Sequence, residues 1–214
     1  MKKIGIFGGT FNPIHTGHVK VADDARKKLK LDKVIFVPTG IPPHKSSKNI
    51  CSSSDRLKMV KLAISKNKYF EVSRTEIKSN KKSYSIETIS KFKRKCGRNT
   101  KIFFFLGIDA MFEISTWKQA REVVKLCKFV CLSRPGYLVK KLKSRLLKEG
   151  FTLSEDFIYL KVPSLKISST EIRSRIELGL NTKNMLPLEV EKYIREKGLY
   201  DRRRNKKKSK KTSD

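Results

Sequence analysis

Short apolar runs alternate along this chain with longer segments in which apolar residues recur at helical spacing. The runs span residues 4–7, 34–37, 70–72, 102–106, 129–132 and 158–162. Several of them are apolar throughout, which is typical of strands that are covered on both faces. The segments between them carry stripes that can pack on a sheet: Ala22, Ala25 and Leu29; Leu57, Val60 and Ile64; and Ile86, Ile89 and Phe92. This alternation predicts an α/β fold with a doubly wound, mostly parallel sheet and helices on both faces.

The last part of the chain divides into a helix and a tail. Residues 187–197 have helical spacing, with proline in the first turn and Gly198 as a stop signal, and Leu199 and Tyr200 can tuck back onto the fold. The following RRRNKKKSKKTSD contains no apolar residue to bury, which predicts disorder. We therefore expect a single domain over residues 1–201 and a basic disordered tail over residues 202–214.

The charge of the chain is far from balanced. The formal net charge is +31, of which residues 202–214 contribute +7 and residues 1–201 contribute +24. A field of this sign attracts nucleotides, pyrophosphate, RNA and acidic membranes alike. A lysine-rich bias displayed on solvated faces explains the same number, so the charge alone names no substrate.

Targeting signals and cysteine spacing add little to this picture. No stretch is long enough to cross a bilayer. The start MKKIGIFGG has the lysines of a signal peptide, but its apolar segment ends within a few residues, and a cytoplasmic location is the default expectation. The four cysteines form no C-x-x-C pair and are expected to be reduced thiols.

The unusual residues of the chain follow predicted strands. GGTFNPIHTGH follows the first strand, PTGIPPHK the second, GID the fourth and PSLKISSTEIR the sixth. In open α/β sheets, ligands bind beyond the carboxyl ends of the strands. If the strands are parallel, these four segments share one edge of the sheet.

Two of the three histidines lie in the first of these segments. Gly8 and Gly9, expected after the strand, permit a tight turn and the close approach of a ligand to the backbone. His18 extends the buried stripe of the first helix to its amino end, where an anion is favoured. Three interpretations of His15 and His18 stay open. They are core or capping residues, metal ligands joined by a third residue such as His44, or donors to a phosphate whose charge grows during a reaction.

The segment ISSTEIR, starting at Ile167, carries a second pattern. Ser168 and Glu171 have the spacing of a capping box, which marks the start of a helix. A capping box does not account for Ser169, Thr170 and Arg173. Together with first-turn N–H groups, their hydroxyls and guanidinium suit phosphate oxygens.

These motifs resemble those of a known superfamily. GGTFNPIHTGH is similar to the H-x-G-H signature of nucleotidyltransferases, and ISSTEIR is similar to the motif that holds the outer phosphates of ATP in them. IPPHK, SYSIETI, FFLGIDAM with the following Trp117, LSRPGY and LPLEVEKYIREKGLY resemble bacterial nicotinate-nucleotide adenylyltransferases, in the order of that family. The resemblance runs from about Lys3 to Tyr200. Asn12 departs from it, since many superfamily members have aspartate there, and Ser85 stands where threonine is frequent.

The resemblance implies a Rossmann-like fold and a reaction. ATP and nicotinate mononucleotide would give nicotinate adenine dinucleotide and pyrophosphate, a step of NAD biosynthesis. His15 and His18 would be catalytic. Mg²⁺ is expected on the ATP phosphates with much of its water shell retained, since these motifs offer few carboxylates. The implied ATP-binding residues are Gly8, Gly9, Thr10, Phe11, His15, His18, Lys45, Ile167, Ser168, Ser169, Thr170 and Arg173. The implied residues for the mononucleotide are His44, Tyr84, Ser85, Gly107, Asp109 and Trp117, with Trp117 stacked on the pyridine ring. Trp117 as core and Asp109 as a helix cap remain alternatives.

Two other functions remain open. A sibling adenylyltransferase would use phosphopantetheine or the amide mononucleotide as acceptor, and the two phosphate motifs do not separate these substrates. From a different class, a nucleic-acid-binding module with an idle site would explain the charge and the tail. A weak, nonspecific contact of the tail with nucleic acid beside an active enzyme is the milder form of this second hypothesis.

Overall fold

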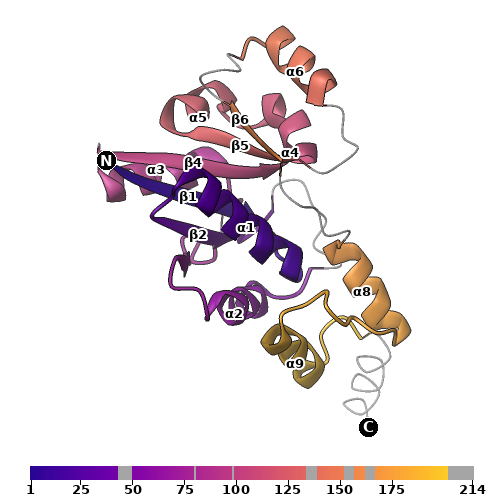
Figure 1. Ribbon diagram of the computed structural model, residues 1–214. Coiled ribbons are helices and arrows are strands. Elements are labelled where there is room, and N and C mark those ends of the chain that lie inside the picture. Colours follow the sequence, from indigo (N-terminus) through magenta and orange to yellow (C-terminus); the bar gives the residue numbers. More distant parts are fainter. Residues whose placement is uncertain are drawn as a thin grey trace.

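The computed structural model describes residues 1–42, 50–79, 81–97, 99–133, 139–151, 157–161 and 167–201 (Figure 1). These residues form one α/β domain around a six-stranded sheet in which every pairing is parallel. The predicted fold class is therefore confirmed, and the sheet is parallel throughout. The proposed division at residue 201 stays a prediction, because residues 202–214 lie outside the described part.

All six predicted strands are present. They are β1 (Lys2–Gly9), β2 (Lys33–Pro38), β3 (Phe70–Val72), β4 (Thr100–Gly107), β5 (Lys128–Ser133) and β6 (Phe157–Lys161). The apolar runs mark their centres, since these residues are buried between two layers of helices. The predicted last residue of the sixth strand, Val162, lies outside the described residues.

The strand order is β3-β2-β1-β4-β5-β6. The chain builds one half of the sheet outward from β1 and then crosses over to β4 to build the other half. The order therefore reverses between β1 and β4, and ligands of doubly wound sheets bind beyond the carboxyl ends at such a point. Gly9 and Gly107 are the last residues of these two strands.

Helices cover both faces of the sheet (Figure 1). One face packs against α1 (Thr16–Leu29), α2 (Ser53–Ile64), α8 (Ser169–Leu178) and α9 (Leu188–Lys197). The other packs against α3 (Ser85–Cys96), α4 (Ile108–Phe112), the 3-10 turn η2 (Ile114–Thr116), α5 (Ala120–Leu126) and α6 (Val139–Lys148). The predicted stripes of α1, α2 and α3 face these cores, although Leu29 and Leu57 are half-buried.

The C-terminal helix follows its prediction closely. Pro187 is the N-cap of α9, and Gly198 ends it with φ 64°, a left-handed conformation that glycine adopts readily. Leu199 and Tyr200 then pack against the core, as expected. In Figure 1 α9 lies beside α2, and the hydroxyl of Tyr193 joins the two helices by donating to Oδ1 of Asp55 at 2.7 Å.

Two further findings concern the cysteines and the search for membrane-spanning helices. The four cysteines are thiols, and none within the described residues forms a disulfide. Across the same residues, we find no helix with both the length and the apolar character that crossing a membrane requires.

Candidate active site

His15 and His18 form a reciprocal cap at the start of α1. His15 is the N-cap residue, and its Nδ1 accepts a hydrogen bond from the backbone N–H of His18 at 3.3 Å. In return, Nδ1 of His18 accepts from the backbone N–H of His15 at 3.2 Å. The two rings stack with centroids 3.7 Å apart. The interpretation of the histidines as capping residues is therefore confirmed.

The cap also determines which ring nitrogen can donate. An imidazole nitrogen that accepts a hydrogen bond carries no proton, so a neutral ring with Nδ1 as acceptor has its hydrogen on Nε2. Both histidines thus carry an Nε2–H donor. Phe7 and Phe11 hold the His18 ring by edge contacts, with centroids at 5.9 and 5.2 Å. Capping and donation to a phosphate are compatible roles for the same rings.

The glycines before the histidines do not make the expected turn. Gly8 and Gly9 are the last residues of β1 and pair with Val37 and Pro38 of β2. The residue with positive φ is Phe11, at 48°. Its ring folds back over Gly9, where a Cβ would lie 3.0 Å from it. This close approach favours glycine at position 9. The expectation that Gly8 and Gly9 follow the strand and form a tight turn is wrong, because both belong to β1.

The two phosphate motifs meet at the edge of the sheet. Nη1 of Arg173 donates to the carbonyl oxygen of Asn12 at 2.8 Å, and Oγ of Ser169 donates to the carbonyl oxygen of Pro13 at 2.8 Å. The hydroxyl of Ser168 caps α8 by accepting from the backbone N–H of Glu171 at 3.1 Å. Segments more than 150 residues apart in the sequence are therefore bonded to each other.

Arg56 is a site residue that the sequence analysis missed. It lies in α2 with 1% of its surface exposed, and its guanidinium donates to the carbonyl oxygens of Thr10, Gly40 and Cys51 at 2.8, 3.0 and 3.3 Å. Burial lowers the pKa of this guanidinium. The bonds connect the loop after β1, the loop after β2 and the start of α2. Nothing in the sequence pattern separates Arg56 from the solvated basic residues around it.

Besides its bond from Arg56, the loop after β2 contacts the segment that precedes α3. The N–H of Gly40 donates to Oγ of Ser83 at 3.2 Å, and a Cβ on Gly40 would lie 2.3 Å from the carbonyl oxygen of Glu76. Burial raises the pKa of the Glu76 carboxyl, whose Oε1 accepts from Thr88 at 2.7 Å. The predicted site residues His44 and Lys45 fall within residues 43–49, which lie outside the described residues.

A second group of predicted residues lies on the other face of the sheet. Ser85 begins α3 directly after its N-cap, Tyr84, and Trp117 ends η2. Lys118 links the two segments, since its Nζ lies 3.5 Å from Oε1 of Glu87 and 4.7 Å from the centre of the Tyr84 ring. Tyr84 and Trp117 pack against the same core cluster. The structure therefore brings the start of α3 beside Trp117.

The environments of Trp117 and Asp109 bear on their alternative roles. The indole packs edge-on against Phe104 and Phe129 at 6.2 and 6.3 Å, yet it is half-buried and lines a cavity of about 490 Å³. Asp109 is exposed in the first turn of α4, next to Gly107 at the end of β4. The rest of the cavity at Trp117 is lined by residues next to Trp117, by α5 and by residues just after α6, and Asp109 is not among them.

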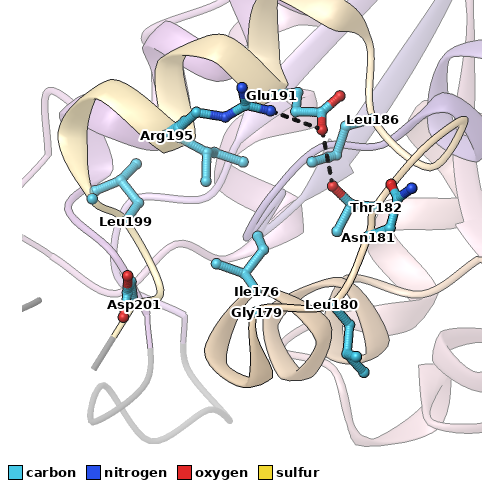
Figure 2. Close-up of a pocket in the computed structure, with 12 residues that line it drawn as sticks. Ile176, Gly179, Leu180, Asn181, Thr182, Leu186, Glu191, Arg195, Leu199 and Asp201 are labelled. Carbon is cyan, nitrogen blue, oxygen red and sulfur yellow. Dashed lines mark hydrogen bonds and ion pairs between the residues drawn. The ribbon is translucent and has the colours of Figure 1, made fainter. Parts of the chain in front are cut away.

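Another cavity, of about 460 Å³, lies between the end of α8 and α9 (Figure 2). The C-terminal half of α8, the loop that follows it and α9 form its walls, and Glu191 bonds Thr182 and Arg195 there. None of the predicted site residues described by the structure lines this cavity. It is separate from the edge where the two motifs meet.

Among the described residues, no three His, Cys, Asp or Glu side chains lie close enough together to bind a metal ion. The donors beside the joined motifs are imidazole, hydroxyl, guanidinium and backbone N–H groups. Such a set suits the oxygens of an anion better than a bare cation.

The chain is similar to a broad class of proteins and, within it, to one family. The family model of cytidylyltransferase-like proteins matches residues 6–175, from within β1 to within α8. Two relatives are named as probable nicotinate-nucleotide adenylyltransferases. The protein from Thermoanaerobacter sp. (strain X514) is 44% identical over 198 residues, 92% of this chain and 94% of its own. The one from Clostridium tetani is 42% identical over 202 residues, 94% of this chain and 100% of its own. The chain belongs to the nicotinate-nucleotide adenylyltransferase family.

A solved structure agrees with this fold. The nicotinic acid mononucleotide adenylyltransferase of Plasmodium falciparum, complexed with NaAD, superimposes with a TM-score of 0.76. The match covers 94% of this chain and 98% of that one, at 20% identity. At this identity the likeness concerns the fold.

Proposed function

We propose that the protein transfers AMP from ATP to nicotinate mononucleotide, giving nicotinate adenine dinucleotide and pyrophosphate. The observation that carries this proposal is the pair of bonds from Arg173 and Ser169 to the carbonyl oxygens of Asn12 and Pro13. These bonds bring the amino end of α8 to the loop that leads into the paired histidines. Family membership supplies the reaction, and the joined motifs supply a cradle of donors for a triphosphate.

ATP is proposed to bind at this cradle. His15 and His18 would point Nε2–H donors at the phosphates, and the amino ends of α1 and α8 would add N–H groups and their dipoles. Thr170 and Arg173 would hold the outer phosphates, with Nη2 of Arg173 already bonded to Oγ1 of Thr170 at 3.2 Å. Gly8, Gly9, Thr10, Phe11 and Ile167 would contribute backbone, since the Phe11 ring itself is buried. Lys45 stays a prediction.

Nicotinate mononucleotide is proposed to bind beyond β4. Trp117 would stack on the pyridine ring, and the amino end of α3 at Ser85 would face the carboxylate. Gly107 and Asp109 would approach the sugar, while Tyr84 forms the adjoining wall. The contact of Lys118 with Glu87 and Tyr84 supports this arrangement, because it holds the two segments together. His44 stays a prediction here.

The proposed reaction needs alignment more than proton transfer. The attacking 5′-phosphate is ionised near neutral pH, so no general base and no side-chain nucleophile are required. Preorganised donors would stabilise charge on the transferring and leaving phosphates. Mg²⁺ fits if ATP phosphates and water hold it, as the donor set described above implies, and when bound it would neutralise phosphate charge.

A turnover assay tests the proposal. The purified chain is incubated with ATP, Mg²⁺ and one of three acceptors: nicotinate mononucleotide, nicotinamide mononucleotide or phosphopantetheine. We expect pyrophosphate release to be fastest with nicotinate mononucleotide. Preference for either of the other acceptors would identify a sibling adenylyltransferase instead.

A further inference from the structure

Tyr200 is bonded to the loop that follows β1, although it lies near the other end of the chain. Its hydroxyl donates to Oδ1 of Asn12 at 2.9 Å and lies 3.1 Å from Sγ of Cys51. Burial raises the pKa of the Tyr200 hydroxyl and of the Cys51 thiol, so both stay protonated at neutral pH. Since the tyrosine proton goes to Asn12, the thiol donates to the tyrosine oxygen.

The backbone at Tyr200 indicates that this contact is strongly favoured. Its φ is 67°, which costs free energy for a residue with a side chain. Such conformations persist where surrounding contacts over-determine them. Here, the turn after Gly198 directs the ring into the core cluster while its hydroxyl reaches Asn12.

Asn12 passes the contact on to the proposed ATP site. Asn12 is 5% exposed, and its Oδ1 also accepts from the N–H of Cys51 at 3.1 Å. The carbonyl oxygen of the same residue accepts from Nη1 of Arg173. A series of bonds thus runs from Tyr200 through Asn12 to the guanidinium of Arg173.

We infer that Tyr200 is a positioning residue for adenylyl transfer, acting through Asn12 on the orientation of Arg173. The inference rests on the proposed function. It assigns the residues after α9 a role in holding the triphosphate cradle in shape. Tyr200 itself does not touch substrate in this assignment.

The test compares two tyrosine-to-phenylalanine variants of the full chain. Tyr200→Phe removes the hydroxyl bonded to Asn12, and Tyr193→Phe, the control, removes the hydroxyl through which α9 bonds Asp55 of α2. We expect Tyr200→Phe to lower kcat/KM for ATP about 5- to 10-fold, the size of one lost buried hydrogen bond, with KM for nicotinate mononucleotide unchanged. Tyr193→Phe should stay within about twofold of wild type in both constants.

A double-mutant cycle separates positioning from general destabilisation. If Tyr200 acts through Asn12, Tyr200→Phe should change turnover less than about twofold when added to Asn12→Ala. Equal activity of the two phenylalanine variants, a parallel rise in both KM values or additive effects in the cycle would each overturn the inference. If the wild-type protein turns over normally and any of these results is found, the inference about Tyr200 is wrong but the proposed function stands. Absence of wild-type turnover overturns the proposed function, and the inference with it.

Discussion

At the scale of single residues, His15 and His18 combine a capping role with the chemical role proposed for them. Each ring uses Nδ1 to accept a backbone N–H of the other residue, and this leaves the hydrogen on Nε2. The cap therefore sets the tautomer that donation to a phosphate requires. The same two rings can therefore cap the helix through Nδ1 and donate to a phosphate through Nε2.

Replacing His18 tests its chemical role. His18→Ala should lower kcat about 100- to 1000-fold, because one preorganised donor is lost. The loss of half the reciprocal cap should cost about 1 kcal/mol of stability, so the fold is retained. Steady-state turnover and thermal unfolding measure the two effects. Lys20→Ala, an exposed change in the same helix, is the control, and turnover of His18→Ala within a few-fold of it would remove His18 from the mechanism.

A second prediction at this scale concerns the contribution of Arg56 to stability. Arg56→Lys should lower the free energy of unfolding by about 2–3 kcal/mol, because an ammonium cannot reproduce the planar donors that reach three carbonyl oxygens. Urea denaturation measures the change. Arg94→Lys, at an exposed position of α3, should be nearly neutral, and an equal effect of the two changes would contradict the role assigned to Arg56.

At the scale of elements, the edge of the sheet is built from loops bonded to one another through backbone carbonyls. Arg56 joins the loops after β1 and β2, while Ser169 and Arg173 join α8 to the first of them. Side chains on helices thus act as anchors for irregular backbone. This arrangement joins the loops after β1 and β2 to α2 and α8 without requiring the loops themselves to be regular.

The loop after β2 offers a test of this packing. Gly40→Ala should destabilise the protein by about 1–3 kcal/mol, because the new Cβ would lie 2.3 Å from the carbonyl oxygen of Glu76. Gly107→Ala at the end of β4 is the control, since a Cβ there meets nothing within 4 Å. Thermal unfolding compares the two variants. Similar melting temperatures would show that the loop after β2 can move aside.

At the scale of the whole molecule, the charge exceeds what a small anionic substrate requires. The net charge is +31, and residues 202–214 contribute +7 of it. Exposed basic residues on α3 and α6 show that the domain itself carries much of the remainder on solvated faces. Charge of this extent favours nonspecific contact with polyanions in addition to the proposed reaction.

Deleting residues 202–214 separates the two activities. Binding of single-stranded RNA, followed by fluorescence anisotropy, should weaken and show a smaller salt dependence, because fewer phosphates are neutralised. Adenylyl transfer should remain within about twofold of the full chain. A truncated protein that keeps full RNA affinity would place the contact on the domain, and loss of turnover would give the tail a role in the reaction.

Much of this architecture could be predicted from local patterns. The apolar runs located every strand, and the stop at Gly198 and the cap at Ser168 were found where local spacing indicated them. The buried Arg56 could not be found, because helical spacing does not show which basic side chain meets carbonyl oxygens from other loops. The tight turn expected at Gly8 and Gly9 is absent, because the sequence does not reveal that β1 continues through both residues or that the Phe11 ring lies against Gly9.

The sequence by itself determined the strands, the main helices, the two phosphate motifs and the family they resemble, because these depend on residues close together in the chain. Only the tertiary structure decided which distant groups meet. Tyr200 and Asn12 are 188 positions apart, and Arg173 and Asn12 are 161 apart. Bonds of this kind form when the sheet and its helices bring several loops within hydrogen-bond distance, which no periodicity encodes. The geometry of the proposed cradle therefore comes from the packing of the whole domain.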